Sequence, residues 1–337
     1  MTDANSAAAT TILTLDPAAE ADRIAVALRA QMQQLKRRGF IVAVSGGVDS
    51  SVCVGLAVRA VGAARVFALF LPERDSDPRS RELFKEWIEA LGVDHVVEDI
   101  SPILEASGCY RRRDEAIRRV VPDYGDGWGC KLVLPGDRLD TDRLNVTHLT
   151  VRAPDGEEQT IRLPAAEYRQ IVAATNFKQR VRKMLEYYHS DRLHYAVVGT
   201  PNRLEYDQGF FVKGGDGLAD VKPIAHLYKS QVYQLAGHLG VPRGVTDRLP
   251  TTDTFSLPQS QEEFYFSLPA RTLDVVLFAY NAGKGPEEAA VLIGLDAGQV
   301  ERVYRDIEQK RSTTRYLHAQ PLLVEPVPGV GGLEGHP

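Results

Sequence analysis

The chain has 337 residues, of which 44% are hydrophobic and 25% charged, a composition typical of a soluble globular protein. Its 40 basic and 45 acidic side chains give a formal net charge of −5 at pH 7, which argues against nucleic acid or an anionic membrane as a partner. Three cysteines without a C-x-x-C pair argue against a disulfide framework and a zinc site. Because no stretch resembles a membrane span or a signal peptide, we expect a cytoplasmic protein with a small-molecule substrate.

The first part of the chain alternates between helical and strand patterns. Asp16-Pro17 begins an amphipathic helix, which we expect to end at Gly39. Short β-branched or aromatic runs predict strands, and helical stretches follow the first two of them. The strands are Phe40–Val44, Arg65–Leu71, His95–Ile100 and Tyr195–Val198, and the helices are Ser51–Val61 and Pro78–Leu91. This alternation predicts an α/β fold with a doubly wound, Rossmann-like parallel sheet flanked by helices.

A glycine-containing loop, Ser45–Ser51, joins the first strand to the helix that follows it. Backbone N–H groups and glycine flexibility at a helix N-terminus form an anion site, which suits a pyrophosphate. Asp49 in this loop would repel bare phosphates unless a divalent cation lay between them, so the loop predicts Mg²⁺. It is not a Walker A loop, because G-x-x-x-x-G-K-[ST] occurs nowhere in the chain.

The segment Cys109–Arg162 breaks the alternation with Asp, Gly and Pro clusters. Within it, Asn145–Arg152 and Glu158–Leu163 are expected to pair as strands across a Pro-Asp-Gly turn. This predicts an inserted loop that contains a β-hairpin. Its basic run fits a solvated face, with contact to an anionic substrate as the alternative. The run consists of Arg111, Arg112, Arg113, Arg118 and Arg119.

Three further stretches contain candidate ligand-binding residues. The run Asn176–Arg182 places Lys178 and Arg182 on one helix face, a pattern that alone is typical of a solvated face. Gly199–Glu205 follows the last predicted strand, at the edge where doubly wound sheets bind ligands. Gly209–Asp220 combines glycines, which allow close approach to a ligand, with charges. Lys229 then opens a helix, a poor position for a cation unless it faces an anion.

The C-terminal third is helical. Leu268–Arg311 predicts three helices, broken at Gly283–Pro286 and at Gly294–Ala297. The last two have helix-turn-helix lengths, but their acidic residues favour packing or dimerisation over DNA binding. We expect a packing helix in 1–39, a catalytic domain in 40–260 with an insertion at 109–165, a helical region in 261–323, and a disordered tail in 324–337.

Six blocks carry a resemblance to a known family. They are S-G-G-x-D-S, N-x-K-x-R-x-R, G-T-x-N-x-x-E, G-F-F-x-K-x-G-D-G-x-A-D, P-I-x-x-L-Y-K-x-Q-V and P-T-x-D, the last at Pro250–Asp253. The first is similar to the loop of the N-type ATP pyrophosphatases. In order and spacing, the set resembles the ammonia-dependent NAD synthetases, and it covers most of Phe40–Asp253.

The resemblance implies an adenine nucleotide alpha hydrolase-like fold, a homodimer and a Mg²⁺-dependent reaction. In that reaction ATP adenylates deamido-NAD, and ammonia attacks the acyl-adenylate to give NAD and AMP. Mg²⁺ would bind Asp49 and Glu205, and catalysis would involve Asp49, Lys213, Asp216 and Lys229. The implied ATP contacts are Ser45, Gly46, Gly47, Val48, Asp49, Ser50, Ser51, Arg180, Thr200, Lys229 and Thr251. The implied substrate contacts are Asn176, Lys178, Arg182, Lys213, Asp216 and Asp220.

Glutamine-dependent relatives carry an upstream domain with a cysteine nucleophile. About forty residues precede the loop here, and they contain no cysteine, so we expect free ammonia or a separate ammonia-supplying protein. Two alternatives stay open: another carboxylate acceptor in a specialised pathway, and a tRNA-modifying ATP pyrophosphatase, which usually needs reactive cysteines or zinc pairs.

Three stretches depart from the family pattern, and one of them is the long insertion Cys109–Arg162 just before Asn176. Thr314–Pro321 stands where the family has a His-Lys-Arg cluster that reaches over the site, and Arg315 and His318 are the candidate replacements. Gln259–Phe266 stands where relatives have an acidic run, and its aromatic residues belong either to the core or to the site.

Overall fold

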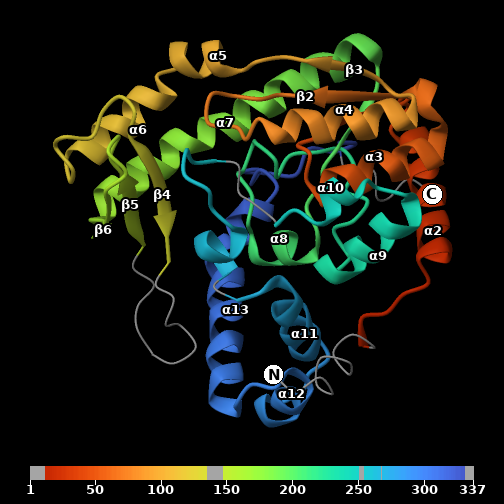
Figure 1. Ribbon diagram of the computed structural model, residues 1–337. Coiled ribbons are helices and arrows are strands. Elements are labelled where there is room, and N and C mark those ends of the chain that lie inside the picture. The colour runs from red at the N-terminus through yellow and green to blue at the C-terminus, as the bar shows by residue number, and fades with distance from the viewer. Residues whose placement is uncertain (1–11, 135–146, 250–253, 267, 331–337) are drawn as a thin grey trace.

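The computed structural model describes residues 12–134, 147–249, 254–266 and 268–330 (Figure 1). At its centre lies a four-stranded sheet in the order β3-β2-β1-β7. All three pairings are parallel, and Phe40 of β1 lies between Val66 of β2 and Ala196 of β7. The strands are β1 (Phe40–Ala43), β2 (Val66–Phe70), β3 (Asp94–Val97) and β7 (Ala196–Val198). This order confirms the predicted parallel sheet.

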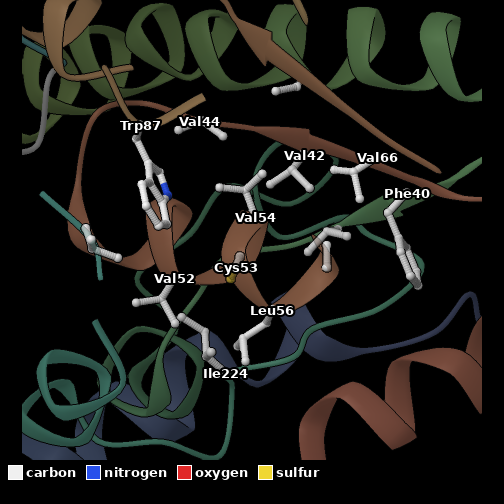
Figure 2. Close-up of a cluster of buried hydrophobic side chains, with 14 of the residues drawn as sticks. Phe40, Val42, Val44, Val52, Cys53, Val54, Leu56, Val66, Trp87 and Ile224 are labelled. Carbon is white, nitrogen blue, oxygen red and sulfur yellow. The ribbon is translucent and has the colours of Figure 1, made fainter. Parts of the chain in front are cut away.

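Helices cover both faces of the sheet, because successive side chains of its strands are apolar and point to opposite faces. Phe40 and Val42 belong to one buried cluster, and Ile41 between them belongs to another. Figure 2 shows the first cluster, in which strand residues meet Val52, Val54 and Leu56. Its helices are α2 (Pro17–Gln34), α3 (Val48–Val61), α4 (Arg79–Leu91) and α9 (Lys229–Leu239), and the opposite face carries α5 (Ser101–Ala106), α6 (Cys109–Arg118) and α7 (Ala165–Leu193).

Helix α2 ends earlier than predicted. Its last residue is Gln34, and Lys36 then adopts a left-handed conformation with φ of 55°. The chain therefore turns before it reaches Gly39. A side chain at Gly39 would overlap the Arg65 carbonyl and the Tyr195 ring, so this glycine serves close packing rather than helix termination.

The insertion forms a second sheet, which lies at the left of Figure 1. Strands β4 (Gly129–Val133), β5 (His148–Arg152) and β6 (Glu158–Arg162) pair antiparallel in that order. His148 lies opposite Arg162, which confirms the predicted hairpin. Buried residues of β4 and β5 pack with Ala116 and Ile117 of α6 and with Ile171 of α7. The insertion thus has its own apolar core, built against two helices of the main fold.

The stretch that we expected to begin as a loop begins with helix α6. Its buried face includes Tyr110, Arg113, Ala116 and Ile117, and the arginine interrupts the apolar periodicity that would predict a helix. Arg113 is buried and donates to Asp75 at 2.8 Å. The interpretation of the whole arginine run as a solvated face is therefore wrong for Arg113, while the other four arginines are exposed.

The three predicted C-terminal helices are confirmed as α11 (Ala270–Asn281), α12 (Pro286–Ile293) and α13 (Ala297–His318). They lie at the bottom of Figure 1 and bury apolar residues against one another and against Leu204 of α8 (Arg203–Gln208). Packing therefore accounts for the apolar faces of α12 and α13. The remaining short elements are η1 (Ala63–Arg65), α10 (Arg243–Thr246) and η2 (Glu262–Phe266).

Residues 324–330, the described part of the tail, contain no helix or strand, and 331–337 lie outside the described residues. Within the described ranges, no helix combines the length and the apolar character needed to traverse a bilayer.

Candidate functional site

A cavity of about 490 Å³ lies at the carboxyl edge of the central sheet. Residues that follow β1, β2 and β7 line it, among them Ser45, Leu71 and Thr200. Helix α7 and the segments 209–216 and 254–265 contribute further lining residues. This is the edge at which doubly wound sheets bind ligands, so the cavity is the candidate active site.

The loop Ser45–Ser50 is held by its own hydroxyl groups. The Ser45 N–H donates to Ser50 Oγ at 3.2 Å, and the Gly47 N–H donates to Ser45 Oγ at 3.3 Å. Gly46 has φ of +79°, and a Cβ there would lie 2.9 Å from the Ser80 carbonyl oxygen, so only glycine fits. Gly47 caps α3 without a side-chain acceptor, which leaves first-turn N–H groups of a 14-residue helix available to an anion at the cavity.

Asp49 lies in the first turn of α3 and meets residues from two distant segments. Its Oδ2 accepts from Lys229 Nζ, and its Oδ1 accepts from Asn202 Nδ2 at 3.1 Å. Lys229 is the first residue of α9 and is 3% exposed. Although burial disfavours the charged form of Lys229, the carboxylates of Asp49 and Glu205 hold its pKa well above the usual value. Lys229, the cation that the sequence predicts at a helix start, therefore faces the carboxylate of Asp49.

Glu205 completes this cluster from α8. Asn202 and Glu205 form a capping box, in which the Asn202 N–H donates to Glu205 Oε2 at 3.1 Å. Glu205 Oε1 accepts from Gln261 Nε2 at 3.0 Å. Burial, followed by the nearby charge of Asp49, raises the pKa of Glu205 to about 7. A buried carboxylate whose ionised form is disfavoured beside a second carboxylate suits an additional cation.

The donor set fits Mg²⁺. No group of three or more His, Cys, Asp or Glu side chains suitable for a metal occurs in the part of the chain that the structure describes. Mg²⁺ is usually bound by one or two carboxylates together with water and substrate phosphates, rather than by an all-protein cage. Asp49 and Glu205, next to an uncapped helix N-terminus, match that requirement.

The segment 209–217 lies against α7 and carries Asp216 into the cavity wall. Asp216 Oδ1 accepts from the Val212 N–H at 2.7 Å, and burial raises the Asp216 pKa. A Cβ at Gly215 would come within 2.9 Å of Gln179 Cβ, so the segment could not sit as close to the helix with a larger residue there. The Lys213 carbonyl accepts from Arg180 Nε at 3.3 Å.

The C-terminal end of α13 covers this segment within the same chain. Lys213 Nζ donates to the carbonyl oxygens of Tyr316 at 2.6 Å and Ala319 at 3.2 Å, at the negative end of the helix dipole. The His318 ring meets Phe211 edge to face at 5.0 Å between centroids. His318 thus contacts the segment from the end of α13, and both His318 and Arg315 are exposed.

Of the other sequence candidates, Asn176, Arg180, Arg182 and Thr200 line the cavity. Asp220 does not, because its carboxylate accepts from the Val197 N–H at 2.7 Å beside the sheet. Gly46 and Ser51 are buried and do not line the cavity. Thr251 lies outside the described residues.

Lys178 points away from the cavity into a buried ionic cluster. Its Nζ donates to Glu73 Oε1 and Asp75 Oδ2, both at 2.8 Å, and to the Thr254 carbonyl at 2.7 Å. It is 1% exposed and does not line the cavity. Its three donors are therefore all engaged by protein acceptors, which favours a structural role for this residue.

Replacing Lys178 by methionine is expected to lower the free energy of unfolding by about 3–5 kcal/mol, because Glu73 and Asp75 would lose a buried partner. Urea denaturation measures the change. The matched control is Lys85→Met, which removes an exposed ion pair with Glu89 and should cost at most about 1 kcal/mol. Equal losses in the two variants would contradict a buried structural role for Lys178.

Sequence reasoning missed several residues at the site. Asp274 of α11 is fully buried and accepts from the backbone N–H groups of Lys229 at 3.1 Å and Ser230 at 2.7 Å. Burial raises its pKa to about 6. The available signal was a lone acid in the apolar run Leu273–Leu277. The buried pair Lys183–Glu186, at 2.6 Å, also lines the cavity.

Sequence comparisons place these features in one family. The model of the NAD synthase family matches residues 20–120 and 151–317. The chain is 59% identical over 315 residues to the NH(3)-dependent NAD(+) synthetase of Rhizobium meliloti (strain 1021), with 94% of each chain covered. It is 34% identical over 281 residues to the enzyme of the same name from Thermotoga maritima, covering 83% of this chain and 92% of the relative.

Comparisons of solved structures agree on the fold. The NMN synthetase of Francisella tularensis aligns with a TM-score of 0.63 at 22% identity, over 92% of this chain and 99% of that one. The NH3-dependent NAD synthetase of Campylobacter jejuni aligns with a TM-score of 0.60 at 18% identity, over 93% and 100%. The matched stretches include the loop Ser45–Ser51 with Asp49, and also Glu205 and Asp216. The chain belongs to the NAD synthase family.

Proposed function

We propose that the chain is an ATP-dependent ligase that forms NAD from deamido-NAD and ammonia, with release of AMP and pyrophosphate. The observation that carries the proposal is the convergence of Asp49, Glu205 and Lys229 at the uncapped start of α3, with Asp216 in the same cavity. Membership of the NAD synthase family and the names of the sequence relatives support it. The family uses ATP as a co-substrate.

In the first half of the reaction, a weakly nucleophilic carboxylate attacks the α-phosphate of ATP and pyrophosphate leaves. This step needs charge stabilisation at the phosphates more than it needs a base. The N–H groups at the start of α3 would receive the pyrophosphate, and Lys229 would neutralise part of its charge. Asp49 and Glu205 would hold Mg²⁺, which supplies further charge neutralisation when bound. Because Lys229 contacts Asp49, its amino group would already be held near the start of α3 when ATP binds.

In the second half, ammonia attacks the acyl-adenylate and AMP leaves. Asp216 is the proposed acceptor of the proton that ammonium must lose, since burial raises its pKa and a carboxylate of greater proton affinity is a better base. The surrounding segment, closed by the end of α13, would limit access of water to the adenylate.

The sheet edge would also hold the remaining parts of ATP and the acceptor. We assign Arg180 and Thr200 to ATP and Asn176 and Arg182 to the acceptor, as the family resemblance implies; all four line the cavity. We further propose a homodimer that works in the cytoplasm and takes ammonia either free or from a separate protein.

The experiment that tests the function supplies Mg-ATP and ammonium with one of two acceptors, deamido-NAD or nicotinate mononucleotide. Mass spectrometry follows AMP, pyrophosphate and the amide product. The mononucleotide is included because a synthetase of NMN shares the fold. We expect AMP, pyrophosphate and NAD with deamido-NAD. AMP with the mononucleotide alone would overturn the substrate, and AMP with neither acceptor would overturn the proposal.

A further inference from the structure

The outer edge of β4 pairs with a segment far away in the chain. The Leu257 N–H donates to the Cys130 carbonyl at 3.2 Å, and the Leu134 N–H donates to the Glu263 carbonyl at 3.0 Å. Between these bonds, the buried side chain of Gln259 donates to the Leu132 carbonyl. The inserted sheet therefore holds residues 257–263 along its free edge.

The same segment forms a wall of the candidate active site. Thr254, Gln261, Phe264 and Tyr265 line the cavity. Phe210, from the segment that carries Asp216, stacks on Tyr265 at 4.7 Å between centroids. Gln259, which bonds to β4, therefore lies only two residues before Gln261, whose side chain lines the cavity.

Gln261 connects this wall to the candidate metal site. Its Nε2 donates to Glu205 Oε1 at 3.0 Å, while the other oxygen of Glu205, Oε2, accepts from the Asn202 N–H. One oxygen of Glu205 is therefore oriented by its own helix start, and the other by a donor that reaches it from the segment held by β4. A carboxylate that binds a metal depends on such outer partners for its orientation.

We propose that the inserted sheet is a positioning element for the metal-binding carboxylate, and that Gln261 is the residue through which it acts. This inference rests on the proposed function, because it takes Glu205 as a Mg²⁺ ligand. Residues 121–150, which include β4, fall outside the match to the family model. The strand that holds residues 257–263 therefore lies outside the matched stretches, whereas β6 lies within them.

The test compares Gln261→Leu, which removes the donor at similar volume, with the unchanged protein. Calorimetry measures binding of Mn²⁺ together with α,β-methylene-ATP, which cannot be cleaved between its α and β phosphates. We expect the variant to bind the metal–nucleotide pair about tenfold or more weakly, as for other outer partners of metal ligands. In turnover, the Mg²⁺ concentration for half-maximal AMP release should rise, while kcat at saturating Mg²⁺ changes less.

Two further variants separate positioning from loss of structure. Gln259→Leu, which breaks the tie to β4 and leaves Gln261 in place, should weaken metal–nucleotide binding in the same direction by a smaller factor. Gln170→Leu removes an amide hydrogen bond between α7 and the Arg112 carbonyl and should leave binding unchanged.

Three results would decide against the inference. Equal metal–nucleotide binding by Gln261→Leu and the unchanged protein would overturn it, as would a loss of kcat with no change in metal dependence. Normal binding by Gln259→Leu would overturn the role of the inserted sheet. Absence of binding by the unchanged protein would instead defeat the proposed function, so the two failures are distinguishable.

Discussion

Replacing Asp49 by asparagine should lower the rate of AMP release by about 10³-fold or more, because preorganised charge at the phosphates supplies most of the catalysis in such a step. The amide keeps an acceptor for Asn202 and removes the negative charge that faces Lys229. Single-turnover release of AMP measures the effect, and circular dichroism checks that the fold persists.

The loss has a second physical explanation, which a double variant resolves. Asn at position 49 leaves Lys229 with one carboxylate neighbour fewer, and an unpaired buried charge can distort a site. Adding Lys229→Met removes that charge. Because Lys229 itself belongs to the proposed site, the readout is urea denaturation: a loss of unfolding free energy in Asp49→Asn that the double variant restores would point to strain and count against the role of Asp49. Asp22→Asn, at an exposed pair with Arg59, is the matched control and should leave release unchanged.

Replacing Asp216 by asparagine should depress amide formation by about 100-fold while ATP/pyrophosphate exchange stays near its original rate. The amide oxygen still accepts from the Val212 N–H, so the segment keeps its shape and loses only its base. The two rates are measured in parallel, one as NAD formed at saturating ammonium and the other as labelled pyrophosphate incorporated into ATP.

Equal losses in the two rates would show that Asp216 supports the whole cavity rather than the ammonia step. Asp155→Asn is the control, since Asp155 lies in the turn between β5 and β6 and its amide keeps the acceptor for the Glu157 N–H. Both rates should be unaffected in that variant.

The sheet and the strand-to-helix loop Ser45–Ser51 could be predicted from sequence because their signals are local. An unbroken apolar run such as Phe40, Ile41 and Val42 indicates a strand buried on both faces. Asp49 and Lys229 could each be placed at a helix start, where the helix dipole makes their charges informative. Their direct contact could not be read, because it joins positions 180 residues apart.

Burial of single charges was the main source of error. Lys178 stands in a run of cations typical of a solvated face, and its acidic partners Glu73 and Asp75 are more than 100 residues away in sequence. Arg113 was misread for the same reason. Nothing in local periodicity distinguishes a lysine that binds substrate from one that neutralises two buried carboxylates, since both lie on a helix face toward the sheet.

The two hydrogen bonds from the first turn of α9 to Asp274 bear on how the chain can be divided. Asp274 belongs to α11, so the amino group that meets Asp49 is oriented by a residue 45 positions downstream. All six blocks of the family resemblance would survive a truncation after Asp253, yet Lys229 would lose the backbone contact to Asp274. The C-terminal helices are therefore no detachable appendage, and a minimal adenylating fragment of this protein must extend through them.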